Sequence, residues 1–250
     1  MNHPVYRFIV LGGWAQPLSA LEPLCQVLKE LGRVTALELN SSSVNIGQAL
    51  DKALQSAKDY EESVVVVGWS LGGLLAIGQL SQASLLPLSP HLKGLVLIGC
   101  NPKFVGNEAW PGVSKAIFDE FTDQLVQSSE KLLQRFNRLQ LLGAAEAKVL
   151  ARASDSWRSK SQAWGQAQLL HSLSWLSEWD KRPQLAALDL PVLHLLGAKD
   201  ALVPSAQLEE ALTRDFPGQM VRMVDGMPHY PDASSCVQIA ILINDFLHDE

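Results

Sequence analysis

The sequence has few cysteines and no long apolar run, and each shortage excludes a class of protein. Cys25, Cys100 and Cys236 are far apart and form no C-x-x-C pair, so we expect reduced, mostly buried thiols instead of a disulfide framework. No apolar stretch approaches the roughly 20 residues of a membrane span, and the N-terminus lacks the basic and apolar regions of a signal peptide. These absences favour a cytoplasmic protein without membrane contact.

Charge is also scarce, and its balance is acidic. Charged residues make up 18% of the 250 residues, hydrophobic residues 47%, and the net charge is −6. Such a chain can bury a sizeable core, whereas its surface would repel nucleic-acid phosphates. No group of His, Asp or Glu residues has metal-ligand spacing, so we expect no metal and no cofactor. We expect a monomer with one α/β domain, or a core with one insertion.

Short apolar runs alternate with helical patterns through the first hundred residues. Residues 64–67 are four valines in a row, which is typical of a strand covered on both faces. Residues 71–80 then have the pattern of a helix packed closely through its glycines. This alternation predicts a mostly parallel sheet with right-handed crossovers. The six predicted strands are residues 8–11, 34–39, 64–67, 95–98, 191–196 and 220–224.

The alternation stops after Cys100, where about 75 residues show helical periodicity without a convincing strand. The candidate helices are residues 114–127, 129–141, 144–153 and 162–178, and residues 239–247 form a closing amphipathic helix. A helical stretch that interrupts a sheet is typical of a lid. We therefore predict an α/β core of residues 1–104 and 186–250 that carries a helical cap, residues 105–185.

The motif Gly68-Trp69-Ser70-Leu71-Gly72 follows the four valines and opens the next helix. A serine hydroxyl is a poor nucleophile at neutral pH unless a base adjoins it and an acid orients that base. A sharp strand–turn–helix elbow exposes the serine, and its crowded backbone requires small residues two positions away on either side. The motif therefore predicts that Ser70 is a nucleophile. The alternative is a tight turn with an inert serine.

The two partners of a serine nucleophile follow in the order acid, then histidine. Asp200 comes directly after the strand at 191–196, and His229 follows the strand at 220–224. Loops after parallel strands lie at one edge of the sheet, the edge that also holds Ser70. Asp189 and Asp225 are alternative acids, in less suitable loops.

Backbone amides must also hold the oxyanion that forms during ester cleavage. We expect one from Leu71, at the start of a helix, and the other from Trp14, in the loop after the first strand. The side chains of Trp14, Trp69 and Phe136 are candidate substrate contacts. Each of these aromatic side chains could instead be a packing residue.

These motifs resemble the α/β-hydrolases, and within them the pimeloyl-[acyl-carrier protein] methyl ester esterases of biotin synthesis. The resemblance rests on four stretches: Gly12-Gly13-Trp14, Gly68 to Gly73, Glu108-Ala109-Trp110-Pro111-Gly112, and residues 135–143. It implies an α/β-hydrolase fold and hydrolysis of a methyl ester on a pimeloyl chain borne by an acyl carrier protein. Gly12 stands where the family has a histidine, and residues 37–41 lack the loop motif common in the superfamily.

The predicted cap is basic although the chain is acidic. Residues 131–152 contain five basic residues and one acid. Lys131 and Arg135, and likewise Lys148 and Arg152, are four residues apart, so each pair shares one face of a helix. The resemblance implies that these four residues dock an acidic carrier protein; an ordinary solvated helix face is the alternative.

Three functions follow from this interpretation. The first is a serine carboxylesterase with the triad Ser70, His229 and Asp200, acting on pimeloyl-carrier methyl ester. The second is a carboxylesterase or lactonase for small free esters, to which the basic residues are irrelevant. The third is an inert hydrolase scaffold used for binding.

Overall fold

The computed structural model describes residues 6–39, 43–82, 90–162 and 164–248. Its centre is a six-stranded sheet in the order β2-β1-β3-β4-β5-β6, in which every neighbouring pair is parallel. The predicted fold class is therefore confirmed. The strands are β1 (Tyr6–Leu11), β2 (Gly32–Leu37), β3 (Ser63–Trp69), β4 (Leu92–Ile98), β5 (Val192–Gly197) and β6 (Met220–Val224).

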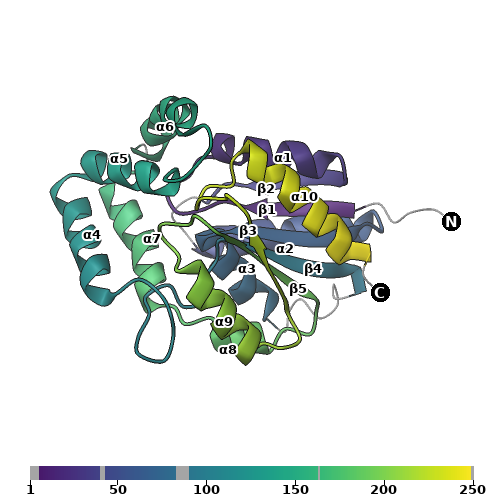
Figure 1. Cartoon of the computed structure of the whole chain (residues 1–250). Helices are drawn as coiled ribbons and strands as arrows, with labels where there is room; N and C mark the ends of the chain where they lie inside the picture. Colours follow the sequence, from purple (N-terminus) through teal and green to yellow (C-terminus); the bar gives the residue numbers. More distant parts are fainter. Residues whose placement is uncertain (1–5, 40–42, 83–89, 163, 249–250) are drawn as a thin grey trace.

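Successive side chains of the central strands enter two different cores, because a strand alternates its side chains between the two faces of a sheet. Val64 and Val66 pack on one face, and Val65 and Val67 on the other. Figure 1 shows helices on both faces. The face of Val65 is covered by α1 (Glu22–Lys29) and α10 (Ala233–His248), and the face of Val64 by α2 (Ser43–Asp59), α3 (Leu71–Leu80) and α9 (Ser205–Asp215).

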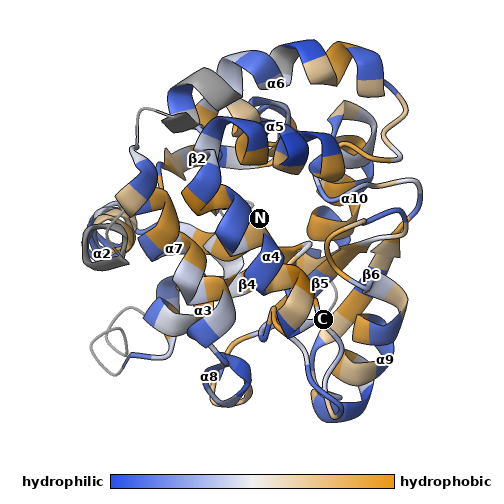
Figure 2. Cartoon of the chain, turned by 90° about the vertical axis from the view of Figure 1, so that its left-hand side faces the viewer, coloured by the Kyte–Doolittle hydropathy of each residue, from blue (hydrophilic) through white to orange (hydrophobic). Residues whose placement is uncertain are grey.

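Among the described residues between β4 and β5 there are five helices. They are α4 (Lys115–Gln127), α5 (Ser129–Gln140), α6 (Ala147–Gln162), α7 (Gln166–Glu178) and α8 (Arg182–Ala186). Ser114 and Ser128 begin α4 and α5 by accepting hydrogen bonds from backbone N–H groups of the first turn. The helices α4 to α7 lie beyond the carboxyl ends of the strands (Figure 1). Figure 2 looks onto this end of the molecule, where hydrophilic residues lie along α4, α5 and α6.

Several element boundaries differ from the prediction. The helix predicted at 144–153 is α6, which continues to Gln162, and the closing helix begins at Ala233 instead of Ile239. The polar first turn of α10 hid this start, which Asp232 caps by accepting from Ser235 N–H. The second strand ends at Leu37, and residues 40 and 41 of the loop that lacks the superfamily motif lie outside the described residues. No helix in the described part of the chain is long and apolar enough to cross a bilayer.

Candidate active site

Ser70 occupies the sharp turn between β3 and α3. Its backbone has φ = +55° and ψ = −121°, a conformation that residues other than glycine rarely adopt. Two hydrogen bonds hold the turn: Ser70 N–H donates to Ile98 O over 2.9 Å, and Gly73 N–H donates to Ser70 O over 2.9 Å. Strain of this kind persists only where the surroundings enforce it, and it is found mainly at functional sites.

The glycines of the motif are required by close backbone approach. A Cβ atom on Gly68 would lie 2.5 Å from Cα of Gly73, and one on Gly72 would lie 2.5 Å from the carbonyl oxygen of Gly12. Non-bonded atoms cannot come so near. The elbow and the loop after β1 are therefore in direct contact, which brings the two loops predicted to hold the oxyanion side by side.

The structure brings Ser70, His229 and Asp200 together in one hydrogen-bonded chain. His229 Nε2 lies 3.0 Å from Ser70 Oγ, and His229 Nδ1 lies 2.8 Å from Asp200 Oδ2. The side chains of His229 and Asp200 are buried, whereas Ser70 is partly exposed. This arrangement suits proton transfer from the serine to the imidazole, with the carboxylate orienting the ring.

Asp200 is itself fixed by its own loop. Its Oδ1 accepts from the N–H groups of Leu202 and Val203, over 2.7 and 2.8 Å, which leaves Oδ2 for the histidine. These two donors were not predicted from the sequence. The signal that could have done so is the tendency of an aspartate in a turn to bind backbone N–H groups two and three residues later.

The two alternative acids named from the sequence lie elsewhere, as does a second buried histidine, His194. Asp189 and Asp225 are exposed, and His229 pairs with Asp200. His194 lies buried in β5, where its Nε2 is 2.8 Å from Gln219 Oε1. Burial lowers the pKa of His194 to about 4. Among the described residues no group of three or more His, Cys, Asp or Glu side chains is placed to hold a metal ion.

The two predicted oxyanion donors belong to segments that adjoin Ser70. Leu71 is the first residue of α3, where an N–H has no partner within its own helix and the dipole favours negative charge. Trp14 follows Gly13, on which a Cβ atom would lie 3.5 Å from Cβ of Ser70. The loop is held in a tight turn in which Gln16 N–H donates to Gly13 O, over 3.3 Å.

The two tryptophans expected to wall the site have different surroundings. The Trp14 indole packs against Phe136 and donates to Ser172 Oγ over 3.1 Å. The Trp69 indole is 0% exposed and belongs to the core on the face of α1 and α10. The structure thus differs from the expectation that Trp69 contacts substrate, because the buried ring offers no exposed surface and does not line the pocket described next.

An apolar pocket of about 560 Å³ lies between the cap helices and the loops of Trp14 and Asp200. Its wall is mainly aromatic and aliphatic, with side chains from α4, α5 and α7 and from the loops that precede α4 and follow β5. Phe136, the predicted substrate contact, is among them, and Arg135 is also part of the lining. The wall includes Phe104, Phe118, Phe121, Phe136, Leu173 and Leu176. This pocket can enclose a short hydrocarbon chain.

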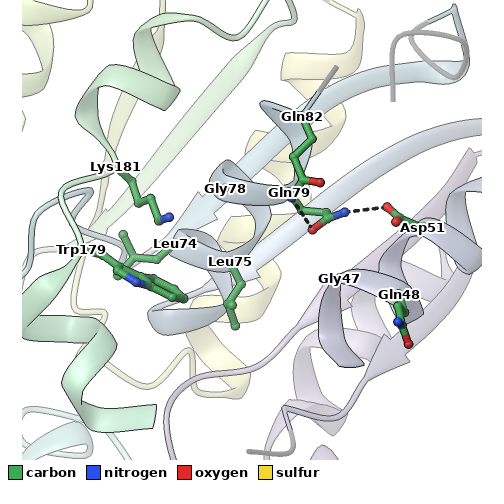
Figure 3. Close-up of a pocket in the computed structure, with 10 residues that line it drawn as sticks. All are labelled: Gly47, Gln48, Asp51, Leu74, Leu75, Gly78, Gln79, Gln82, Trp179 and Lys181. Carbon is green, nitrogen blue, oxygen red and sulfur yellow. Dashed lines mark hydrogen bonds between the residues drawn. The ribbon is translucent and has the colours of Figure 1, made fainter. Parts of the chain in front are cut away.

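A second hollow, of about 400 Å³, lies between α2 and α3 (Figure 3). Asp51 accepts a hydrogen bond of 2.8 Å from Gln79 Nε2, and Lys181 lies over the ring of Trp179. No residue of the hydrogen-bonded chain lines this hollow, so the apolar pocket is the candidate substrate site.

The four candidate docking residues are all exposed, but they do not form a single cluster. Lys131 and Arg135 line a crevice between α4 and α5, Arg152 lines another between α5 and α6, and Lys148 is exposed on α6. Arg135 also pairs with Glu120 over 3.2 Å. The basic surface is therefore spread along two crevices on either side of α5.

Comparison with known proteins identifies the family. Residues 44–231 match the family model described as alpha/beta hydrolase fold. The chain is 32% identical to the pimeloyl-[acyl-carrier protein] methyl ester esterase of Pseudoalteromonas atlantica, over 79% of this chain and 77% of that protein. It is 29% identical to the esterase of the same name from Vibrio cholerae, over 89% and 87%.

Among solved structures, the bromoperoxidase of Bacillus anthracis matches with a TM-score of 0.79 at 19% identity. The match covers 99% of this chain and 94% of that one. At this identity the likeness shows the shared fold. The chain therefore belongs to the α/β-hydrolase fold family and, within it, to the family of the pimeloyl-[acyl-carrier protein] methyl ester esterases.

Proposed function

We propose that this protein is a serine carboxylesterase that hydrolyses the methyl ester of a pimeloyl chain carried by an acyl carrier protein, as a step of biotin synthesis. The observation that carries the proposal is the hydrogen-bonded chain from Ser70 Oγ through His229 to Asp200. The names of the similar esterases support the choice of substrate.

In the first half of the reaction, His229 Nε2 takes the proton of Ser70, and Ser70 Oγ attacks the ester carbonyl carbon. The carbonyl oxygen becomes an oxyanion, which accepts hydrogen bonds from the backbone N–H groups of Leu71 and Trp14. Asp200 stabilises the imidazolium. The carbon–oxygen bond to the methoxy group then breaks, and His229 returns its proton so that methanol leaves.

In the second half, His229 removes a proton from water, which attacks the acyl carbon of the acyl-enzyme. The bond to Ser70 Oγ breaks, and the serine regains a proton from His229. The products are the carrier-bound pimeloyl chain with a free carboxylate, one methanol, and the unchanged enzyme. The apolar pocket suits the methylene chain, since its wall is mainly aromatic and aliphatic.

The carrier itself would contact the basic residues of α5 and α6. Lys131 and Arg135 are exposed on α5, which borders the pocket, and Lys148 and Arg152 are exposed on the neighbouring helix α6. A positive surface attracts an acidic partner. We place the reaction in the cytoplasm, in line with the three free and buried cysteines.

A second function, hydrolysis of small free esters, is favoured by one observation. Arg135 is engaged by Glu120 and by Gln124, over 3.2 and 2.7 Å, so part of the basic surface is already neutralised within the cap. Under this alternative the pocket alone selects the substrate.

Complementation tests the proposal. A bacterial strain that lacks its pimeloyl-carrier methyl esterase requires biotin, and we expect the wild-type chain to restore growth without biotin. The Ser70→Ala variant, produced at the same level, should not. Growth with Ser70→Ala would contradict the proposed nucleophile. Failure of the wild type to restore growth, while it still cleaves a short nitrophenyl ester, would favour the second function.

A further inference from the structure

Trp69 and Ser70 are neighbours in the chain, and both bind His229. Ser70 Oγ meets the imidazole, at 3.0 Å from Nε2, whereas Trp69 Nε1 donates to the backbone carbonyl of the same histidine over 2.9 Å. The indole also lies against the imidazole, with ring centroids 6.0 Å apart. One end of β3 therefore holds both the ring and the backbone of the histidine.

The bond from Trp69 is the one hydrogen bond that the backbone of His229 makes within the described part of the chain. The flanking anchors belong to other residues: Tyr230 N–H donates to Gln140 O, and Lys199 N–H donates to Met227 O. Trp69 is completely buried, so water cannot replace its N–H as a donor, and loss of the bond would leave a buried carbonyl unpaired.

The position of the histidine matters because a shift of about 1 Å at a reacting group can cost about a hundredfold in rate. Ser70 cannot follow such a shift freely, since its backbone is held in the strained conformation of the elbow. The distance between Ser70 Oγ and His229 Nε2 therefore depends on where the histidine backbone is anchored.

We propose that Trp69 is a positioning residue, whose indole N–H fixes the backbone of His229 at the distance that Ser70 needs. This inference rests on the proposed serine mechanism and assigns Trp69 no contact with substrate. It explains why a large side chain next to the nucleophile lies on the face of the sheet opposite the pocket.

Two substitutions remove the donor. Trp69→Phe keeps an aromatic ring, and site-specific replacement of Trp69 by benzothienylalanine keeps the shape of the indole without its N–H. On a short nitrophenyl ester, which needs no carrier, we expect kcat to fall about 10- to 100-fold. KM should stay within about twofold, because the interaction lost acts on the chemical step.

Tyr230→Phe is the matched control. The Tyr230 hydroxyl donates to Ala20 O over 3.0 Å, so this variant also leaves one buried backbone carbonyl unpaired, in the same aromatic cluster as Trp69. We expect its thermal stability to fall as in the Trp69 variants while kcat stays near that of the wild type. The downfield proton resonance of the bond between His229 and Asp200 should shift or broaden in the Trp69 variants alone.

The inference would be overturned if the benzothienylalanine protein kept the wild-type kcat, or if Tyr230→Phe lowered kcat as much as Trp69→Phe. A rise in KM at unchanged kcat would also contradict it, because that result indicates a substrate contact. Failure of the proposed function looks different: Ser70→Ala would then retain the nitrophenyl esterase activity, whatever the Trp69 variants do.

Discussion

At the elbow, the glycines lie against other backbone atoms, whereas the basic residues of α5 and α6 face solvent. A Cβ atom at Gly68 or Gly72 would meet main-chain atoms at 2.5 Å, and the side chains of His229 and Asp200 are buried. Lys131 and Arg152 instead line separate crevices. Under the proposed function, backbone geometry at the elbow sets the chemistry, and the exposed side chains of α5 and α6 select the substrate.

The largest effect should come from filling the elbow. In Gly72→Val, the new Cβ would lie 2.5 Å from Gly12 O and 2.6 Å from Leu11 O, so the loop that carries Trp14 must move. We expect esterase activity to fall more than about a hundredfold and the free energy of unfolding to fall by about 1–3 kcal/mol. Nitrophenyl ester kinetics and urea unfolding measure both.

Gly218→Ala is the control for this substitution, because a Cβ there would have no atom within 4 Å. It should change neither quantity noticeably. If Gly72→Val retained full activity, the close backbone contacts of the elbow would not be required for the chemistry, and the contrast with the exposed residues of α5 and α6 would fail.

A smaller effect, confined to one substrate, is expected in the cap. Replacing Lys131, Arg135, Lys148 and Arg152 by glutamine should lower kcat/KM on a carrier-linked methyl ester about 10- to 100-fold, because attraction of the acidic carrier is lost. Activity on a nitrophenyl ester should remain. A control variant carries the same change of charge at four exposed residues of the α/β core domain, Lys29, Lys52, Lys93 and Arg222. It separates the effect of docking from the effect of net charge.

The outcome decides between the two proposed functions. If both quadruple variants act alike on the carrier-linked ester, the cap residues form an ordinary solvated surface. If the cap variant loses both activities equally, Arg135 acts through the pocket that it lines and not through a carrier.

The smallest effect on activity is expected from substitution of His194, which lies in β5 and takes no part in the hydrogen-bonded chain. This residue should instead influence how stability depends on pH. Its pKa is about 4 in the folded protein because of burial, against about 6.5 when unfolded. Between these values the unfolded chain binds more protons, so stability falls as pH drops from about 6.5 towards 4, by about 2–3 kcal/mol at pH 4.5. Urea unfolding should show a shallower decline in His194→Leu; equal declines would contradict the assignment.

Much of this organisation could be predicted from the sequence. Four consecutive valines, a glycine-flanked serine and polar residues directly after apolar runs give the parallel sheet and the order of the loops, because carboxyl ends of parallel strands share one edge. The burial of Trp69 was also within reach, since it continues the alternation of Val65 and Val67. Its position beside Ser70 is the competing signal, which indicates a substrate contact.

Other features depend on contacts between distant segments, which periodicity does not encode. Helical spacing predicted that Lys131 and Arg152 are exposed, but their separation into two crevices follows from the way α4, α5 and α6 pack. The bond from Trp69 to His229 likewise joins residues 160 positions apart, and no local pattern indicates it.

The proposed function requires that Ser70 drives hydrolysis of a carrier-linked methyl ester. The most direct measurement is the intact mass of a pimeloyl-carrier methyl ester after incubation with the wild-type protein or with Ser70→Ala. We predict that the wild type lowers the mass of the carrier by that of one CH2 group, because the methyl ester becomes the acid. Ser70→Ala should leave the mass unchanged. An unchanged mass with the wild type, or the same loss with Ser70→Ala, would contradict the account.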